Sequence, residues 1–185
     1  MKIFYSFLTL FLSFSVHAAV FTEATSESFT QASYQMSALN KAMKDGADLL
    51  KNGDLAAISA HSQYISSLVK KGESQFGSTV FEPLGSCFAA GLFSRSWWNA
   101  QLAATHNGGI EKRPGSIADA LGEYTTNRDE CLKTADPKAA AQAKTENDAQ
   151  LQEKLGGGRE CLTVFDVDPE SKEVFAKPKP AHCKS

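Results

Sequence analysis

The residue types best suited to recognition gather near the middle of the chain, where two tryptophans precede a histidine and a glycine loop. Neighbouring residues on a helix point about 100° apart, so if Trp98 faces a core, Trp97 is free to anchor a protein interface. The alternative is that Trp97 packs against a fifth helix or the C-terminal hairpin. The candidate binding residues are Trp97, His106, Asn107, Glu111, Lys112 and Arg113.

Arg95 interrupts an otherwise apolar helical stripe, which makes it a candidate buried charge. An unpaired charge inside a protein is costly. Arg95 therefore either reaches water from the edge of the core or pairs with a carboxylate. The available carboxylates on neighbouring segments are Glu82, Asp119 and Glu123.

Known catalytic signatures are absent from the sequence. The chain has no G-x-S-x-G serine motif, no C-x-x-C pair and no glycine-rich phosphate loop between a strand and a helix. His106 with Glu111 or Glu82 would supply an acid and a base to an unrecognised hydrolase site. Stabilisation of a helix terminus explains His106 equally simply. We therefore expect no catalytic residues, no metal site and no cofactor.

The four cysteines, Cys87, Cys131, Cys161 and Cys183, are spaced too widely for a zinc site, whose ligands usually come in close pairs. An even number in an exported chain predicts two disulfides, with three pairings open. We favour Cys87–Cys131 between adjacent helices, and Cys161–Cys183 around a hairpin, which closes with little loss of chain entropy. Another pairing would tie the C-terminal segment to the helices.

The first residues predict export. Met1-Lys2 precede an uncharged run, and Val16-His17-Ala18 has the small residues of a signal-peptidase site. We place cleavage after Ala18, which leaves residues 19–185 as a single exported domain; the alternative is an uncleaved N-terminal anchor. No later stretch of the sequence is apolar and long enough to span a membrane, so we expect no stable span after cleavage.

Apolar residues recur every three or four positions in four segments, which predicts amphipathic helices at about 29–50, 55–71, 83–104 and 116–132. A fifth helix at about 137–155 is rich in alanine, glutamine, lysine and glutamate. Such a segment is helical by propensity but weakly held. It is therefore a solvated outer helix or a spacer.

After the glycines at 156–158 the pattern changes to β-prone segments on either side of Asp168–Ser171, which predicts a hairpin. Prolines at 178 and 180 keep the tail extended. The predicted fold class is thus mainly α. We expect a compact bundle of about four to five helices over 19–155, with a small β-hairpin and tail over 156–185, stapled by disulfides.

The formal net charge of −2 and the lack of a basic stripe argue against a nucleic-acid partner. By elimination of catalytic signatures, we expect a non-enzymatic periplasmic or secreted binding protein from a bacterium, with an extracytoplasmic protein as its partner. Inhibitors and immunity proteins that neutralise a toxin or a cell-wall enzyme share these features: an export signal, disulfides, compact helices and no catalytic set. The alternatives are an envelope-acting hydrolase and a structural or accessory envelope protein.

Overall fold

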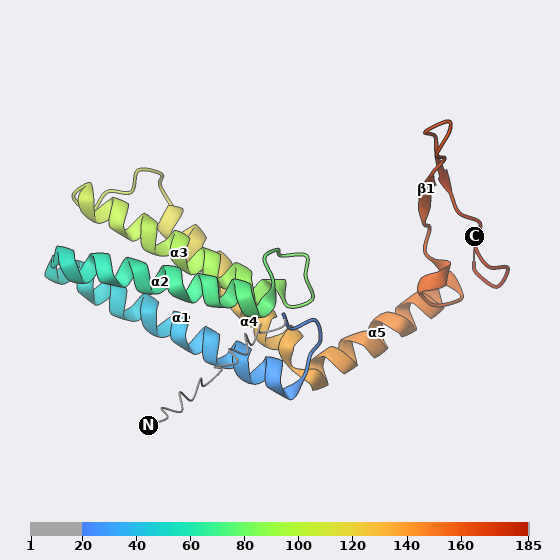
Figure 1. The fold of residues 1–185 in the computed structure, drawn as a ribbon, viewed down its shortest axis with the longest axis horizontal. Coiled ribbons are helices and arrows are strands. Elements are labelled where there is room, and N and C mark those ends of the chain that lie inside the picture. The colour runs from blue at the N-terminus through green and yellow to red at the C-terminus, as the bar shows by residue number, and fades with distance from the viewer. Residues whose placement is uncertain (1–19, 185) are drawn as a thin grey trace, which may run out of the picture.

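The computed structural model describes residues 20–184, so the predicted signal peptide and its cleavage after Ala18 lie outside the described residues. In Figure 1 the helices within residues 26–135 lie together, the helix of residues 137–155 leads away from them, and a small hairpin lies beyond it. The elements are α1 (Ser26–Asn52), α2 (Leu55–Phe76), α3 (Gly85–His106), α4 (Ser116–Ala135), α5 (Pro137–Leu155), the short 3₁₀ helix η1 (Arg159–Cys161), β1 (Phe165–Val167) and β2 (Val174–Ala176). The mainly helical fold class with a small antiparallel sheet is confirmed.

Helix α3 is the centre of the bundle, because it packs against α1, α2 and α4. The apolar core draws residues from all four helices, including Leu39, Phe76, Trp98 and Tyr124, each 2 % exposed or less. Contact on several sides leaves α3 with buried residues around its whole circumference in its first half, at positions 87–91. This arrangement decides which of the predicted surface residues reach solvent.

The turn between α1 and α2 is formed by Gly53, which ends the first helix, and Asp54, which caps the second. Gly53 takes the left-handed conformation (φ 69°) that ends α1, where a side chain would be strained. The Asp54 carboxylate accepts the backbone N–H groups of Ala56 and Ala57, which caps α2. At the start of α4, Gly115 takes the left-handed conformation (φ 85°) and the helix has no side-chain cap.

Both disulfides form with the favoured pairing. Cys87 on α3 joins Cys131 on α4, across a sequence separation of 44 residues. Cys161 joins Cys183, across 22 residues. The first bridge fastens two helices of the bundle, and the second closes the C-terminal segment on itself rather than onto the helices.

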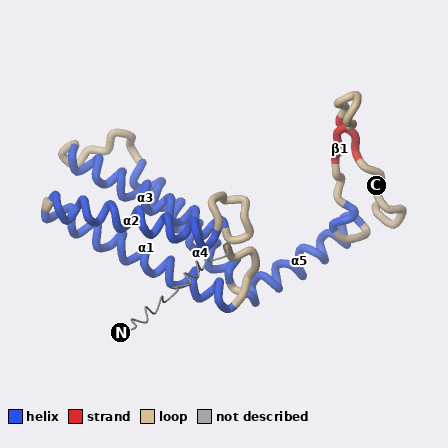
Figure 2. The backbone as a smooth tube through the Cα atoms, viewed as in Figure 1, coloured by secondary structure: helices blue, strands red, loops and turns tan. Residues whose placement is uncertain are grey.

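Helix α5 does not join the bundle, so the compact part contains four helices. None of its residues is buried, and the core cluster contains no residue of α5 or the hairpin among those that the structure describes. Figure 2 shows α5 carrying the two strands away from the other helices. The physical reason is composition, because an alanine-, lysine- and glutamate-rich helix has little apolar surface to bury. No helix within residues 20–184 has the length and apolarity that a membrane span requires.

Candidate functional site

Trp97 belongs to the core, so it is not part of a recognition surface. Its side chain is 6 % exposed and that of Trp98 is 1 % exposed. Both lie in the core cluster of α1–α4, so the expected alternatives, solvent or a contact with the fifth helix or hairpin, are both wrong. Adjacent residues are buried together because α3 has neighbours on several sides. Trp97 and Trp98 point about 100° apart around α3, and both directions lead to faces that neighbouring helices cover.

The remaining predicted binding residues lie together at the C-terminal end of α3 and in the loop that follows. His106, Asn107 and Lys112 are exposed. The Asn107 side chain donates to Ile110 O at 2.9 Å, which holds the loop in a tight turn. Gly108 and Gly109 continue the turn with positive φ. These residues form a polar loop without an aromatic anchor.

The acidic and basic members of this loop face different surroundings. Glu111 is half-buried, and its Oε2 reaches neither solvent nor a hydrogen-bond partner among the described residues. Arg113 is exposed and lies 3.9 Å from Asp119 on α4. An exposed pair at this distance contributes little to stability. The acid–base pair of His106 with Glu82 is not assembled, because these residues flank opposite ends of α3, whose 22 residues span about 33 Å.

Arg95 is exposed, which corrects its assignment as a candidate buried charge. No ion pair joins it to Glu82, Asp119 or Glu123 within the part of the chain that the structure describes. The exposure follows from the helix geometry. Residues 94, 97 and 98 lie within an arc of about 100° on the covered side of α3, and position 95 lies outside this arc, beside the exposed positions 96 and 99.

The buried histidine is His61, which serves packing. Its Nε2 lies 2.9 Å from Ala42 O. Because a carbonyl only accepts, this nitrogen carries the proton. The imidazole edge meets the Trp98 ring at a centroid distance of 4.9 Å. His61 therefore has a structural partner on α1 and another on α3.

Cys161, His182 and Cys183 come close enough together to suggest a metal site. Both cysteines are disulfide-bonded, so neither offers a thiolate to a metal. His182 instead lies 3.4 Å from the Glu160 carboxylate. Backbone N–H groups of Glu160 and Gly158, with His182, hold the pKa of Glu160 below its usual range. This cluster fastens the end of the chain to η1.

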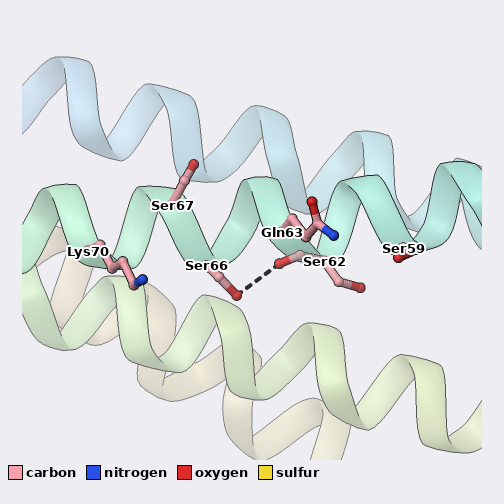
Figure 3. Close-up of a pocket in the computed structure, with 6 residues that line it drawn as sticks. All are labelled: Ser59, Ser62, Gln63, Ser66, Ser67 and Lys70. Carbon is pink, nitrogen blue, oxygen red and sulfur yellow. Dashed lines mark hydrogen bonds between the residues drawn. The ribbon is translucent and has the colours of Figure 1, made fainter.

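A groove of about 400 Å³ runs along α2, shown in Figure 3. Its lining is Ser59, Ser62, Gln63, Ser66, Ser67 and Lys70. The hydroxyl protons of Ser62 and Ser66 are donated to carbonyls of the same helix, Ile58 O and Ser62 O, at 2.9 Å. Ser62 Oγ also accepts the Trp98 indole N–H at 2.8 Å. The hydroxyls of Ser62 and Ser66 are thus held by backbone and core.

The C-terminal module, residues 156–184, offers a different kind of surface. Gly156 ends α5 in the left-handed conformation (φ 78°). The Cys161–Cys183 bridge then gathers η1 and the tail, and Lys184 N–H donates to Leu155 O at 2.7 Å. The hairpin of β1 and β2 projects from this base (Figure 2). The disulfide and the tail contact therefore give a small hairpin a fixed support.

The two faces of the hairpin differ in chemistry. Phe165 pairs with Ala176, and Val167 with Val174. Directly opposite residues share a face, so one face is wholly apolar. Its larger side chains are uncovered, with Phe165 65 %, Val167 52 % and Val174 67 % exposed. We call these four residues the apolar hairpin face.

The opposite face carries charge. Lys177 Nζ lies 2.9 Å from Asp166 Oδ2, and this contact holds the pKa of Asp166 below its usual range. At the turn, the N–H groups of Ser171 and Glu170 lower the pKa of Asp168. Sequence reasoning predicted the hairpin but missed its apolar face. The alternation of apolar and charged residues in Phe165-Asp166-Val167 was the signal that could have found it.

Comparison with known protein families, with curated proteins and with solved structures gives no match for this chain. The geometry described above is therefore the basis on which function is inferred.

Proposed function

We propose that this chain is a non-enzymatic binding protein that acts outside the cytoplasm and contacts a protein partner through its C-terminal module. The observation that carries the proposal is the uncovered apolar hairpin face at the end of α5. Exposed apolar surface that is locally continuous is typical of interaction sites. Two disulfides with no free cysteine among the described residues suit an oxidising compartment such as the periplasm or the medium.

Inhibition of a toxin or of a cell-wall enzyme is the form of binding that we propose to test first. A protein of this kind must present a surface to its target without itself performing chemistry. A hairpin at the end of a helical arm meets that need, because α5, about 28 Å long for 19 residues, holds the hairpin away from the bundle (Figure 1). The bundle then serves as the folded body that carries the arm.

Site-specific crosslinking tests the proposal. A photo-reactive residue at Val174, on the apolar hairpin face, should give a discrete adduct with one envelope protein in the producing cell. The matched control is the same residue at Ala141, which is exposed on α5. Absence of an adduct at Val174, or equal adducts at both positions, would refute binding through the hairpin. Addition of the purified mature chain to the captured protein then tests inhibition directly.

A second candidate is an accessory envelope protein in which α5 acts as a spacer, which the complete lack of buried residues in α5 favours. Inserting two helical turns within 141–150 lengthens the arm by about 11 Å and preserves its direction. A binder that uses only the hairpin face keeps its adduct and its affinity after this insertion. A spacer loses its function because the distance between its two ends is what matters.

A further inference from the structure

The hairpin register determines which backbone groups point away from the sheet. Asp168 N–H donates to Glu173 O at 2.9 Å, and Lys177 N–H donates to Val164 O at 2.8 Å. Hydrogen-bonded and non-hydrogen-bonded pairs alternate along an antiparallel ladder. Three residue pairs lie between these two. The middle pair, Asp166 with Phe175, is hydrogen-bonded, whereas Phe165 with Ala176 and Val167 with Val174 are non-hydrogen-bonded pairs. The residues whose N–H and C=O groups face outward are Phe165 and Val167 on the β1 edge and Val174 and Ala176 on the β2 edge.

The two edges are not equally open. On the β1 edge, Val167 N–H is taken by the Asp166 carboxylate at 2.9 Å. On the β2 edge, the outward groups of Val174 and Ala176 have no hydrogen-bond partner among the residues that the structure describes. Unpaired strand edges readily add another strand. β2 is therefore the edge at which the sheet can grow.

The sequence of this edge is complementary to itself. The five residues Glu173-Val174-Phe175-Ala176-Lys177 place an acid and a base at equal distances from Phe175. When a second copy runs antiparallel about Phe175, Glu173 lies opposite Lys177 of that copy, and Val174 lies opposite its Ala176. The outward groups of Val174 and Ala176 then form hydrogen-bonded pairs, as the ladder geometry requires.

We propose that two copies of this chain associate through β2, antiparallel about a two-fold axis at Phe175, to form a four-stranded sheet. The symmetry is that of an isologous interface, in which the same patch serves both copies. Opposite charges directly across a strand pair stabilise it. The proposed alignment contains two such pairs, one at each end.

Other alignments are poorer. A shift of one residue sets outward backbone groups against inward ones, so hydrogen bonds are lost. A shift of two in one direction brings Pro178, which has no N–H, into the ladder. A shift of two in the other direction brings in Lys172, whose φ of 61° is not that of a strand. The second of these shifts also separates the opposite charges, because it sets Glu173 opposite Phe175, whereas the first replaces Lys177 by Lys179 as the partner of Glu173 and is disfavoured by Pro178 alone.

Association at β2 leaves the apolar hairpin face free and extends it, because a two-fold axis perpendicular to the sheet keeps both apolar faces on the same side. The inference does not depend on the proposed function, since only a second copy is needed. Two short strands bury little surface compared with a stable dimer. The dimer is therefore reversible and depends on concentration.

Charge reversal tests the pairing. Sedimentation equilibrium of the mature chain, up to millimolar concentration, should show dimers. Glu173→Lys places lysine opposite lysine at both ends, and Lys177→Glu places glutamate opposite glutamate, so each variant should self-associate about tenfold more weakly. An equimolar mixture of the two variants should recover the parent affinity, because every cross-strand pair in the mixed dimer is again opposite in charge.

Lys177→Glu also breaks the contact with Asp166 within one chain. The matched control is Asp166→Asn, which removes that contact but leaves the intermolecular pairs intact and should dimerise like the parent. A purely structural effect of the charge changes would not be rescued by mixing. A parent chain that remains monomeric throughout, or a mixture that stays as weak as its components, overturns the proposal.

A cysteine pair reports the alignment independently. Directly opposite residues in a non-hydrogen-bonded pair have Cα atoms about 4.5 Å apart, within the range of a disulfide. Phe175→Cys should therefore oxidise to a covalent dimer. In Val174→Cys the two cysteines are offset diagonally by about 7–8 Å, so crosslinking should be much slower. Equal rates for the two variants would contradict alignment at Phe175.

Discussion

Replacing Gly46 by alanine probes a close approach of α1 to side chains of α2 and α3. An ideal Cβ at this position of α1 would lie 2.8 Å from His61 Nε2 and 2.8 Å from a ring carbon of Trp98. Both rings are buried, and His61 is held by its hydrogen bond to Ala42 O. Neither ring is the free end of a flexible chain, so the clash is not relieved by a simple rotation.

The magnitude follows from opposing effects. Alanine in place of glycine favours a helix by about 1 kcal/mol. Overpacking a core costs about 1–3 kcal/mol, and displacement of His61 would remove a hydrogen bond with a net contribution of about 1 kcal/mol. We therefore expect Gly46→Ala to lower the free energy of unfolding by about 1–3 kcal/mol, even though it improves local helix propensity.

Urea unfolding followed by tryptophan fluorescence measures this change, with the disulfides intact. The matched control is Gly122→Ala on α4, where no heavy atom lies within 4 Å of the new Cβ. There we expect a gain of about 0.5–1 kcal/mol. If Gly46→Ala is as stable as the parent or more so, the close packing of α1 on His61 and Trp98 is wrong. Trp98→Phe in the Gly46→Ala background should recover part of the loss, since it removes one clashing ring.

The remaining predictions concern a buried phenol and the two bridges. Tyr124→Phe removes a 2.7 Å hydrogen bond to an asparagine of α1, so urea unfolding should show a loss of about 1 kcal/mol. Burial raises the pKa of Tyr124 from 10.0 to about 12. The unfolded chain therefore loses this proton first, and the free energy of unfolding should fall as pH rises between these two values, a trend that Tyr124→Phe abolishes. Replacing Cys87 and Cys131 by alanine opens the 44-residue connection and should destabilise the bundle by about 4 kcal/mol. Replacing Cys161 and Cys183 should leave the unfolding of the bundle unchanged and accelerate amide exchange in the hairpin; an equal effect of both pairs would contradict the separation of the two parts.

Local features of the chain were predictable because their causes are local. The three-and-four spacing of apolar residues fixes the helical segments, and Gly53 with Asp54 fixes the turn between the first two. The favoured disulfide pairing was also predictable from sequence, since Cys161 and Cys183 bracket a hairpin whose turn is indicated by the residues Asp168–Ser171.

The predictions that failed concern which side chains are buried, because burial depends on how many other helices pack against a helix. Trp97 was expected at a surface or against the C-terminal elements, and it lies in the core of α1–α4. Arg95 was a candidate buried charge, and its exposure agrees with the alternative that it reaches water from the edge of the core. A sequence stripe indicates one covered face, whereas α3 has several, because three helices pack around it. Leu55 shows the converse. It continues the apolar stripe of α2 but is 73 % exposed, because it is the first residue of the helix.

The sequence by itself determined the helices and the hairpin and favoured one of three pairings of the cysteines, since periodicity, turn chemistry and chain entropy act over short stretches of chain. Only the tertiary structure decided that α5 stands apart from the bundle and that one hairpin face and the β2 edge are left uncovered. The physical reason is that burial is a relation between elements. The sequence Val174-Phe175-Ala176 would be the same whether its sheet were covered or open. Only the absence of a neighbouring strand among the described residues shows that the β2 edge can pair.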